Sequence, residues 1–155
     1  MMNDYIEKKS ELKTLLKKLN GDEKPEFGLM TPQHMIEHLA QTIKFSNGKA
    51  PQKLVFKNEV AKKIKFRITQ TNSEIQPGFK TPILPKDKLL DLDFENIVEA
   101  INNLITEIED FEQFKREKPN SKPINPVMGE MELSDWDIFH NKHIRHHLRQ
   151  FKLIA

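Results

Sequence analysis

Apolar residues recur every three or four positions in several stretches of the chain, which is the spacing of amphipathic helices. The strongest pattern spans residues 94–115, where Asp93 is a suitable residue to cap the helix. A second pattern begins at Asn3 or Asp4 and ends before Gly21, a residue that favours a left-handed helix stop. We therefore expect a helix in each of these stretches.

Two further helices have clear starting residues. Thr31 is a good N-cap, and Pro32 after it suits the first helical position. The last predicted helix spans residues 134–151 and can be capped by Ser134. Four principal helices joined by loops, with no competing strand pattern, predict an all-α four-helix bundle.

The chain between the second helix and residues 94–115 is less regular. Residues 51–66 predict an extra short helix, and cations gather in and beside it at Lys53, Lys57, Lys62, Lys63, Lys65 and Arg67. This basic face could contact an anion, a membrane or nucleic acid, or it could simply be solvated. Residues 68–86 form a long irregular connection, which either covers a functional site or only crosses between distant ends of the bundle.

Length and composition limit the classes of protein to consider. The chain has 155 residues, so we expect a single domain over residues 1–155. Its formal net charge of +2 gives little support for nucleic-acid binding, and the absence of cysteine excludes disulfides, zinc–thiolate sites and a cysteine nucleophile. No stretch resembles a signal peptide or a membrane span, so we expect a cytoplasmic protein without a membrane partner. A homodimer is compatible with the sequence.

Histidine is confined to two of the predicted helices. The six histidines are His34 and His38 in the second helix, and His140, His143, His146 and His147 in the last. Imidazole is the commonest side-chain ligand for borderline divalent metals. The chain could therefore build one histidine site where these two helices meet.

Helical positions separate the candidates within the last helix. Residues three, four and seven apart share a face, so His140, His143 and His147 form one stripe, and His146 falls outside it. The same stripe carries apolar side chains at Trp136, Ile144 and Phe151. The three imidazoles should therefore point toward the apolar side of the helix.

In the second helix, His38 lies on the flank of the predicted buried face and His34 lies further round toward solvent, so His38 is the better ligand candidate. His143 and His147 have the i, i+4 spacing that lets two imidazoles bind one metal. Buried imidazoles need partners for both ring nitrogens, so these residues are either hydrogen-bonded in the core or metal ligands. Neither a Cys-x-x-Cys nor a His-Glu-x-x-His motif is present, which excludes a zinc ribbon and a zincin.

One part of the last helix, HIRHHLRQ at residues 143–150, resembles the signature of the DinB-like (YfiT-like) metalloenzyme superfamily. In that signature a histidine is followed three and four residues later by a histidine pair, and then by Arg and Gln. Residues 30–39, MTPQHMIEHL, resemble the superfamily's second helix. Residues 125–131, NPVMGEM, are similar to a segment found in a subgroup of unknown function.

The resemblance implies a four-helix bundle in which three histidines hold a divalent metal ion. In this chain those positions are His38, His143 and His147. Some relatives are thiol-dependent transferases or hydrolases, which implies a low-molecular-weight thiol cofactor and a small-molecule substrate. The chain lacks the glycine that the commoner form has near the Arg and Gln. His140 is an additional histidine and the candidate catalytic residue, as a fourth ligand, a hydrogen-bond partner of a ligand or a general base.

We therefore expect a metal-dependent enzyme, with zinc, nickel or iron as the metal. The alternative is a non-catalytic, stress-related helical bundle that binds a small ligand or a metal. A third hypothesis is nucleic-acid binding through residues 53–67, against which the nearly balanced charge of the chain argues.

Overall fold

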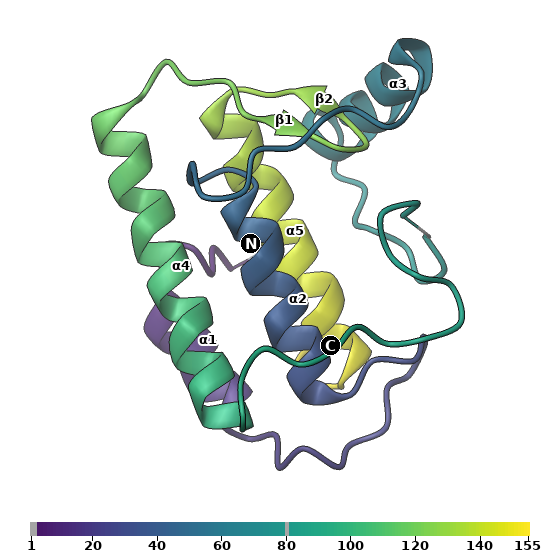
Figure 1. Ribbon diagram of the computed structural model, residues 1–155, viewed down its shortest axis with the longest axis vertical. Helices are drawn as coiled ribbons and strands as arrows, with labels where there is room; N and C mark the ends of the chain where they lie inside the picture. Colours follow the sequence, from purple (N-terminus) through teal and green to yellow (C-terminus); the bar gives the residue numbers. More distant parts are fainter. Residues whose placement is uncertain (1–2, 80) are drawn as a thin grey trace.

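The computed structural model describes residues 3–79 and 81–155 and consists mostly of helices (Figure 1). Those residues form five helices and one antiparallel pair of short strands. The bounds in chain order are α1 Lys9–Leu16, α2 Pro32–Lys44, α3 Asn58–Gln70, α4 Ile97–Glu117, β1 Ile124–Asn125, β2 Gly129–Glu130 and α5 Leu133–Gln150. The prediction of an all-α helical bundle is confirmed. None of the described helices combines the length and apolar character needed to cross a membrane.

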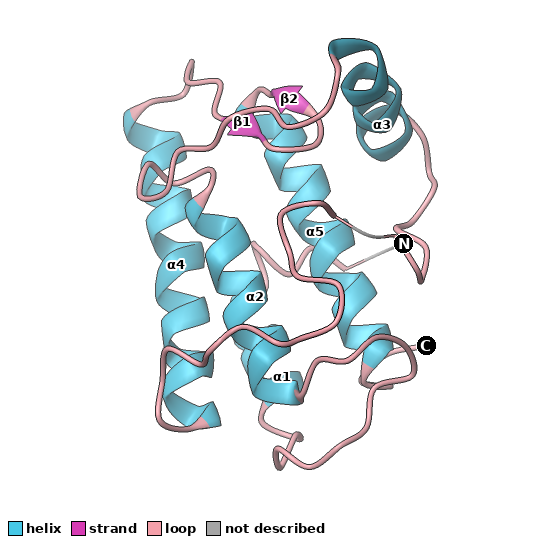
Figure 2. Ribbon diagram, turned by 45° about the vertical axis from the view of Figure 1, so that its right-hand side comes forward, coloured by secondary structure: helices cyan, strands magenta, loops and turns pink. Residues whose placement is uncertain are grey.

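The second helix, α2, lies at the centre of the bundle. It packs against α4 on one side and α5 on the other, and the three helices run side by side along the long axis (Figures 1 and 2). The short helix α1 packs against α4, whereas α3 stands outside the bundle and contacts α5 and β2. The connection from α3 to α4 passes over the face that α2 and α5 form (Figure 2).

Of the three N-cap residues that the sequence predicted, the structure confirms one. Thr31 caps α2 and Pro32 occupies its first position, as predicted. However, α4 is capped by the side chain of Asn96 and not by Asp93, which lies in the preceding loop. The prediction that Ser134 caps α5 was also wrong, because the helix begins one residue earlier without a side-chain cap.

The residues before Lys9 do not belong to the first helix, and a hydrogen bond joins them to α5. The first helix begins at Lys9, later than the predicted start at Asn3 or Asp4. The Oδ1 atom of Asn141 in α5 accepts the backbone N–H of Tyr5 at 2.7 Å. The sequence had predicted that Tyr5 lies in the first turn of the first helix. In the structure its backbone N–H is bound by a distant residue of α5.

Helix α3 is displaced along the chain from the predicted residues 51–66. It covers Asn58–Gln70, and the residues before it are not helical. The backbone N–H of Val55 donates to the carbonyl oxygen of Pro126 at 2.8 Å, which ties this segment to the turn between β1 and β2. A contact with a distant loop therefore replaces the first turns of the predicted helix.

The strand pair was not predicted, because strands of two residues are too short to show a period-two pattern. Its turn is built by two residues of the NPVMGEM segment. The Oδ1 atom of Asn125 accepts the N–H groups of Val127 at 2.9 Å and Met128 at 3.1 Å. Gly129 has a φ of 81°, which favours glycine over residues with a Cβ atom. The segment therefore has a clear structural role.

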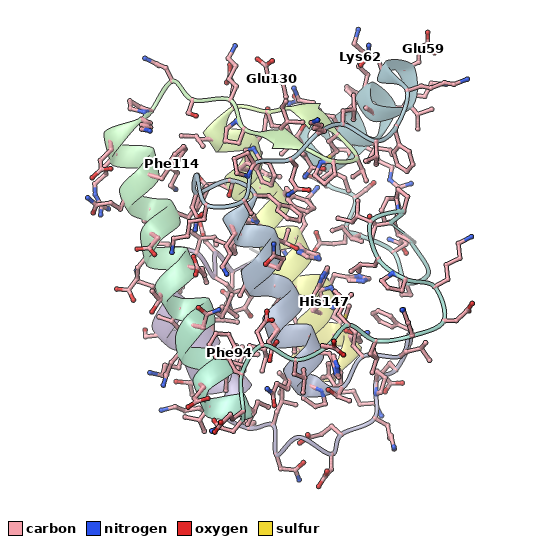
Figure 3. The ribbon with its side chains drawn as sticks, in the orientation of Figure 1. Glu59, Lys62, Phe94, Phe114, Glu130 and His147 are labelled. Atoms are coloured by element: carbon pink, nitrogen blue, oxygen red, sulfur yellow. The ribbon has the colours of Figure 1, made fainter. Side chains whose placement is uncertain are left out.

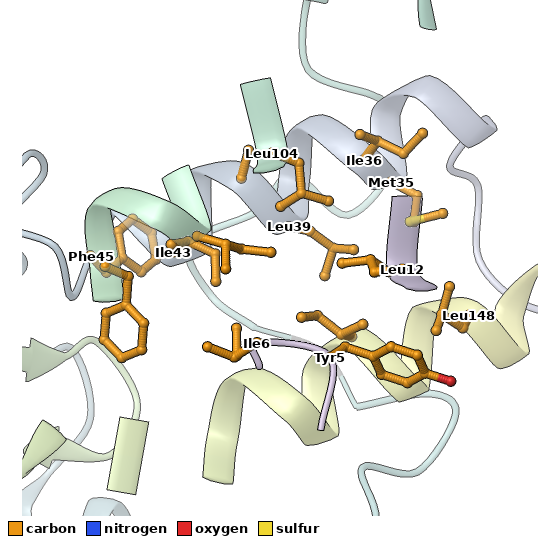
Figure 4. Close-up of a cluster of buried hydrophobic side chains, with 14 of the residues drawn as sticks. Tyr5, Ile6, Leu12, Met35, Ile36, Leu39, Ile43, Phe45, Leu104 and Leu148 are labelled. Carbon is orange, nitrogen blue, oxygen red and sulfur yellow. The ribbon is translucent and has the colours of Figure 1, made fainter. Parts of the chain in front are cut away.

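The hydrophobic core fills the space between α1, α2, α4 and α5, and the N-terminal segment contributes to it (Figure 4). Leu12, Met35, Leu39, Leu104 and Leu148 come from the four helices and are all fully or almost fully buried. Because α2 and α5 meet in this core, its packing also fixes the relative position of the histidines on the two helices.

Replacing Leu104 with alanine should destabilise the protein by about 2–5 kcal/mol, because it removes a side chain that is 0% exposed and leaves a cavity. Val98 on the same helix is 62% exposed, so Val98→Ala is the matched control and should change stability by less than about 0.5 kcal/mol. Urea unfolding at neutral pH measures both effects. Similar losses in the two variants would contradict this placement of the core.

Candidate metal centre

Three histidines from two helices meet at one point. The Nε2 atom of His143 lies 3.0 Å from that of His38 and 3.2 Å from that of His147. Atoms able to bind a metal on all three rings lie within 4.8 Å of one another. Nitrogens that bind one tetrahedral zinc ion at about 2.0–2.1 Å are about 3.3 Å apart. The three residues, called the histidine cluster below, can therefore hold one metal ion.

The backbone explains why these three residues meet. His143 and His147 lie one turn apart on α5, so their side chains leave the same face of the helix. His38 reaches them from α2, which packs directly against α5. Figure 3 shows His147 beside α2, on the side toward the long connection. The sequence pattern had selected these same three positions.

A hydrogen bond fixes the protonation of His147. The side-chain Nε2 of Gln150 donates to the carbonyl oxygen of Phe27 at 2.9 Å, so its Oε1 is the atom that faces His147. That Oε1 lies 2.7 Å from Nδ1 of His147 and must accept a proton from it. The proton of this neutral ring is therefore on Nδ1, and the lone pair of Nε2 points into the histidine cluster.

Hydrogen bonds alone do not satisfy the cluster. The Nε2 atom of His143 faces two other ring nitrogens, but it carries either one proton or one lone pair. A proton there can serve only one of the two contacts well, and a lone pair would face the lone pair of His147 at 3.2 Å. A cation among the three rings would instead receive a lone pair from each. The donor set thus fits a divalent metal ion.

The environment keeps these imidazoles neutral. Burial lowers the pKa of His143 and His147 well below the ordinary value, and the neighbouring histidines lower it further. Burial, with a smaller effect from His146, lowers the pKa of His38 to about 4. All three rings are therefore neutral near pH 7, and the ring nitrogen of each that carries no proton can bind a metal.

His140 lies on the same face of α5 but does not join the cluster. It is only 1% exposed, and its Nε2 lies 2.7 Å from the hydroxyl oxygen of Ser46. That hydroxyl donates to the carbonyl oxygen of Ile43, so it accepts a proton from His140. The other ring nitrogen, Nδ1, is buried and has no hydrogen-bond partner among the described residues, and burial lowers the pKa of His140 to about 3. His140 thus connects α5 to the end of α2.

The remaining two histidines bind backbone carbonyls. His34, expected near solvent, is half-buried: its Nδ1 lies 2.6 Å from the hydroxyl of Thr31 and its Nε2 lies 3.0 Å from the carbonyl oxygen of Leu90. His146 lies with its Nδ1 3.1 Å from the carbonyl oxygen of Ile75. Both residues therefore contact the long connection between α3 and α4.

A cavity of about 630 Å³ opens beside the histidine cluster. All three cluster residues line it, and most of the other lining side chains are apolar. The long connection contributes Ile75, Phe79, Ile83 and Leu84, and the turn between the strands contributes Val127 and Met128. The described part of the connection therefore covers the site, which was one of two roles that the sequence left open.

A second stripe of α5 holds this cover in place. The ammonium group of Lys142 donates to the carbonyl oxygens of Ile68 at 2.7 Å, Thr71 at 2.9 Å and Ser73 at 2.7 Å. The guanidinium groups of Arg145 and Arg149 both bind the carboxylate of Glu74, which appears in the connection directly after α3. The helix that carries two cluster histidines thus also anchors the start of the cover.

The sequence analysis missed two residues that support the site. Gln150 was quoted in the resemblance without a role, although its spacing of three from His147 places both on one face of α5. The second residue is Glu37 of α2. Its carboxylate accepts the backbone N–H groups of Asp93 at 2.6 Å and Phe94 at 3.4 Å, at the far end of the connection.

The metal-free protein should lose stability as the pH falls below about 6.5, where an unfolded histidine becomes protonated. Buried His140, with its pKa lowered to about 3, cannot take up this proton in the folded state. This residue alone should lower the free energy of unfolding by about 2 kcal/mol between pH 7 and pH 5. Urea unfolding of chelator-treated protein measures the loss, and it should be smaller in His140→Gln. Equal pH dependence in the two proteins would contradict the neutral, buried state of His140.

Comparison with known proteins places the chain in a family. A family described as "Protein of unknown function (DUF1569)" matches residues 8–153, a range that includes all five helices and the histidine cluster. No curated protein matches the chain, and no solved structure matches it. Since the family match extends over nearly the whole sequence, the chain belongs to the DUF1569 family.

Proposed function

We propose that the protein is a metal-dependent enzyme in which His38, His143 and His147 hold a divalent ion, with zinc, nickel and iron as candidates. The observation that carries this proposal is the meeting of three Nε2 atoms, two of the contacts being 3.0 and 3.2 Å, on the wall of a cavity. Histidine ligands alone accept several borderline metals, so the donor set does not select one of them.

The number of ligands favours a catalytic site over a structural one. Structural zinc sites usually have four protein ligands, whereas catalytic sites have three and leave a position for water or substrate. A divalent ion held here would lower the pKa of a water or thiol beside it and so supply a nucleophile near neutral pH. The adjacent cavity of about 630 Å³ is large enough for a small-molecule substrate.

The resemblance to the DinB-like superfamily supports a more specific form of the proposal. In that form, the reaction is a transfer or hydrolysis that uses a low-molecular-weight thiol. The chain contains no cysteine, so the thiol must belong to a cofactor or to the substrate. The cavity has room for such a molecule next to the histidine cluster.

For His140, the contacts favour none of the three roles that the sequence left open and support a positioning role instead. Its Nε2 is engaged by Ser46, and the residue is not among those that line the described cavity. It therefore acts on the site through the position of α5. The test is His140→Gln, which keeps a donor for Ser46 and should retain the metal with its affinity reduced at most modestly.

Protein purified without an affinity tag should contain one divalent ion per chain by elemental analysis. His143→Ala should lose this metal and keep its helical circular dichroism, because His143 contacts both other cluster residues. His146→Ala is the matched control on the same helix and should retain the metal. A His143→Ala protein with stoichiometric metal would refute the proposal. Absence of metal, together with no thermal stabilisation by zinc, nickel or iron, would favour the non-catalytic bundle.

Gln150→Leu should weaken metal binding by roughly 10–100-fold, because it removes the acceptor that orients His147. Gln150→Glu is the discriminating control: it keeps an acceptor facing Nδ1 of His147 but loses the donor to Phe27. It should therefore retain the metal better than Gln150→Leu. Zinc affinity measured by competition with a chromophoric chelator tests this order. Equal affinities in both variants would show that Gln150 acts only by anchoring Phe27.

A further inference from the structure

We propose that the cavity beside the histidine cluster binds an organic anion, whose negative group pairs with Lys63 and Arg67 and whose apolar body lies against the cavity wall. This inference rests on the proposed function only in taking this cavity as the substrate site. The pairing of the anion with the two cations does not require the metal.

The charge of the cavity lining carries the proposal. Among the described residues that line the cavity, Lys63 and Arg67 are the charged side chains apart from the histidines, and no Asp or Glu is present. The two residues lie one turn apart on α3, so their side chains share a face of that helix. The lining of this cavity therefore offers two positive groups side by side, whereas the carboxylates of Glu37, Asp91 and Asp93 line an adjoining cavity of about 750 Å³ that shares His38 with it.

The two cations are also available. Within the described residues, neither forms an ion pair or a side-chain hydrogen bond, whereas the nearby Lys65 donates to the backbone carbonyl of Glu130. Both side chains are exposed to solvent, so a ligand can reach them. A guanidinium group and an ammonium group together can bind a carboxylate, sulfonate or phosphate group.

The other side chains of the cavity wall favour a ligand with an apolar body. Ile64 and Ile68 lie beside the two cations on α3, and Phe45, Val127, Met128 and Phe139 line the cavity with them. Such a surface binds hydrocarbon or aromatic groups, which a small inorganic anion lacks. The chemistry thus selects an amphiphilic molecule with one anionic end.

The basic segment, which the sequence analysis left without a function, divides into two sets. Lys63 and Arg67 line the cavity, whereas Lys62 points away from the body of the protein (Figure 3). Nucleic acid or a membrane would use the outward set. Lys62 is therefore the matched control, because it is a cation of the same helix outside the cavity.

The test uses metal-free protein and two fluorescent probes with the same aromatic groups. Anilinonaphthalenesulfonate carries a sulfonate, and N-phenylnaphthylamine is its neutral counterpart. The double variant Lys63→Glu/Arg67→Glu should bind the anionic probe roughly tenfold more weakly and the neutral probe as well as before, since two attractive charges become repulsive. Lys62→Glu should leave the binding of both probes unchanged.

The outcomes separate this inference from the metal proposal. Equal losses for both probes, or an equal effect of Lys62→Glu, would overturn the anion site. The variant Lys63→Gln/Arg67→Gln removes the charges without adding repulsion, so its loss of affinity for the anionic probe should be intermediate. It also controls for an effect of the reversed charges on folding. The metal content of the double variant should equal that of the wild type. If the His143→Ala experiment refuted the metal proposal, the double variant should still weaken the binding of the anionic probe and not that of the neutral probe.

Discussion

The site depends on the packing of α2 against α5. This contact places Nε2 of His38 3.0 Å from Nε2 of His143. Leu39 and Leu148 lie in the same hydrophobic core as the rest of this interface (Figure 4). One helical turn advances a residue by about 5.4 Å, so a slip of a single turn would separate the rings completely. The apolar core therefore determines the geometry of the polar cluster.

Two neighbouring stripes of α5 perform different tasks. One carries the histidines that face α2, and the other carries Lys142, Arg145 and Arg149, which bind the first residues of the long connection. Glu37 on α2 binds the last residues of the same connection through Asp93. The two helices that hold the histidine cluster thus also hold both ends of its cover, so the cavity and the cluster are built as one unit.

Local sequence predicted the parts of this structure that depend on local physics. The helical period identified the bundle helices, and the i, i+4 spacing identified His143 and His147 before their contact with His38 was known. Long-range contacts explain the features that were not predicted. The backbone N–H of Val55 donates to the carbonyl oxygen of Pro126, and Nε2 of His140 is hydrogen-bonded to the hydroxyl of Ser46. Neither contact has a signature in the neighbouring sequence, so the start of α3 and the surroundings of His140 could not be predicted.

Electrostatics connects the metal proposal to the anion site. Three neutral imidazoles would leave the full charge of the proposed divalent ion uncompensated, and the described residues that line the cavity of about 630 Å³ include no carboxylate. Burying such a charge beside apolar walls is costly unless a negative group approaches it. Lys63 and Arg67 add further positive charge to the same lining and would be unfavourable neighbours for a cationic ligand. The charge of the proposed metal ion and the charges of Lys63 and Arg67 thus both favour an anionic ligand over a cationic one.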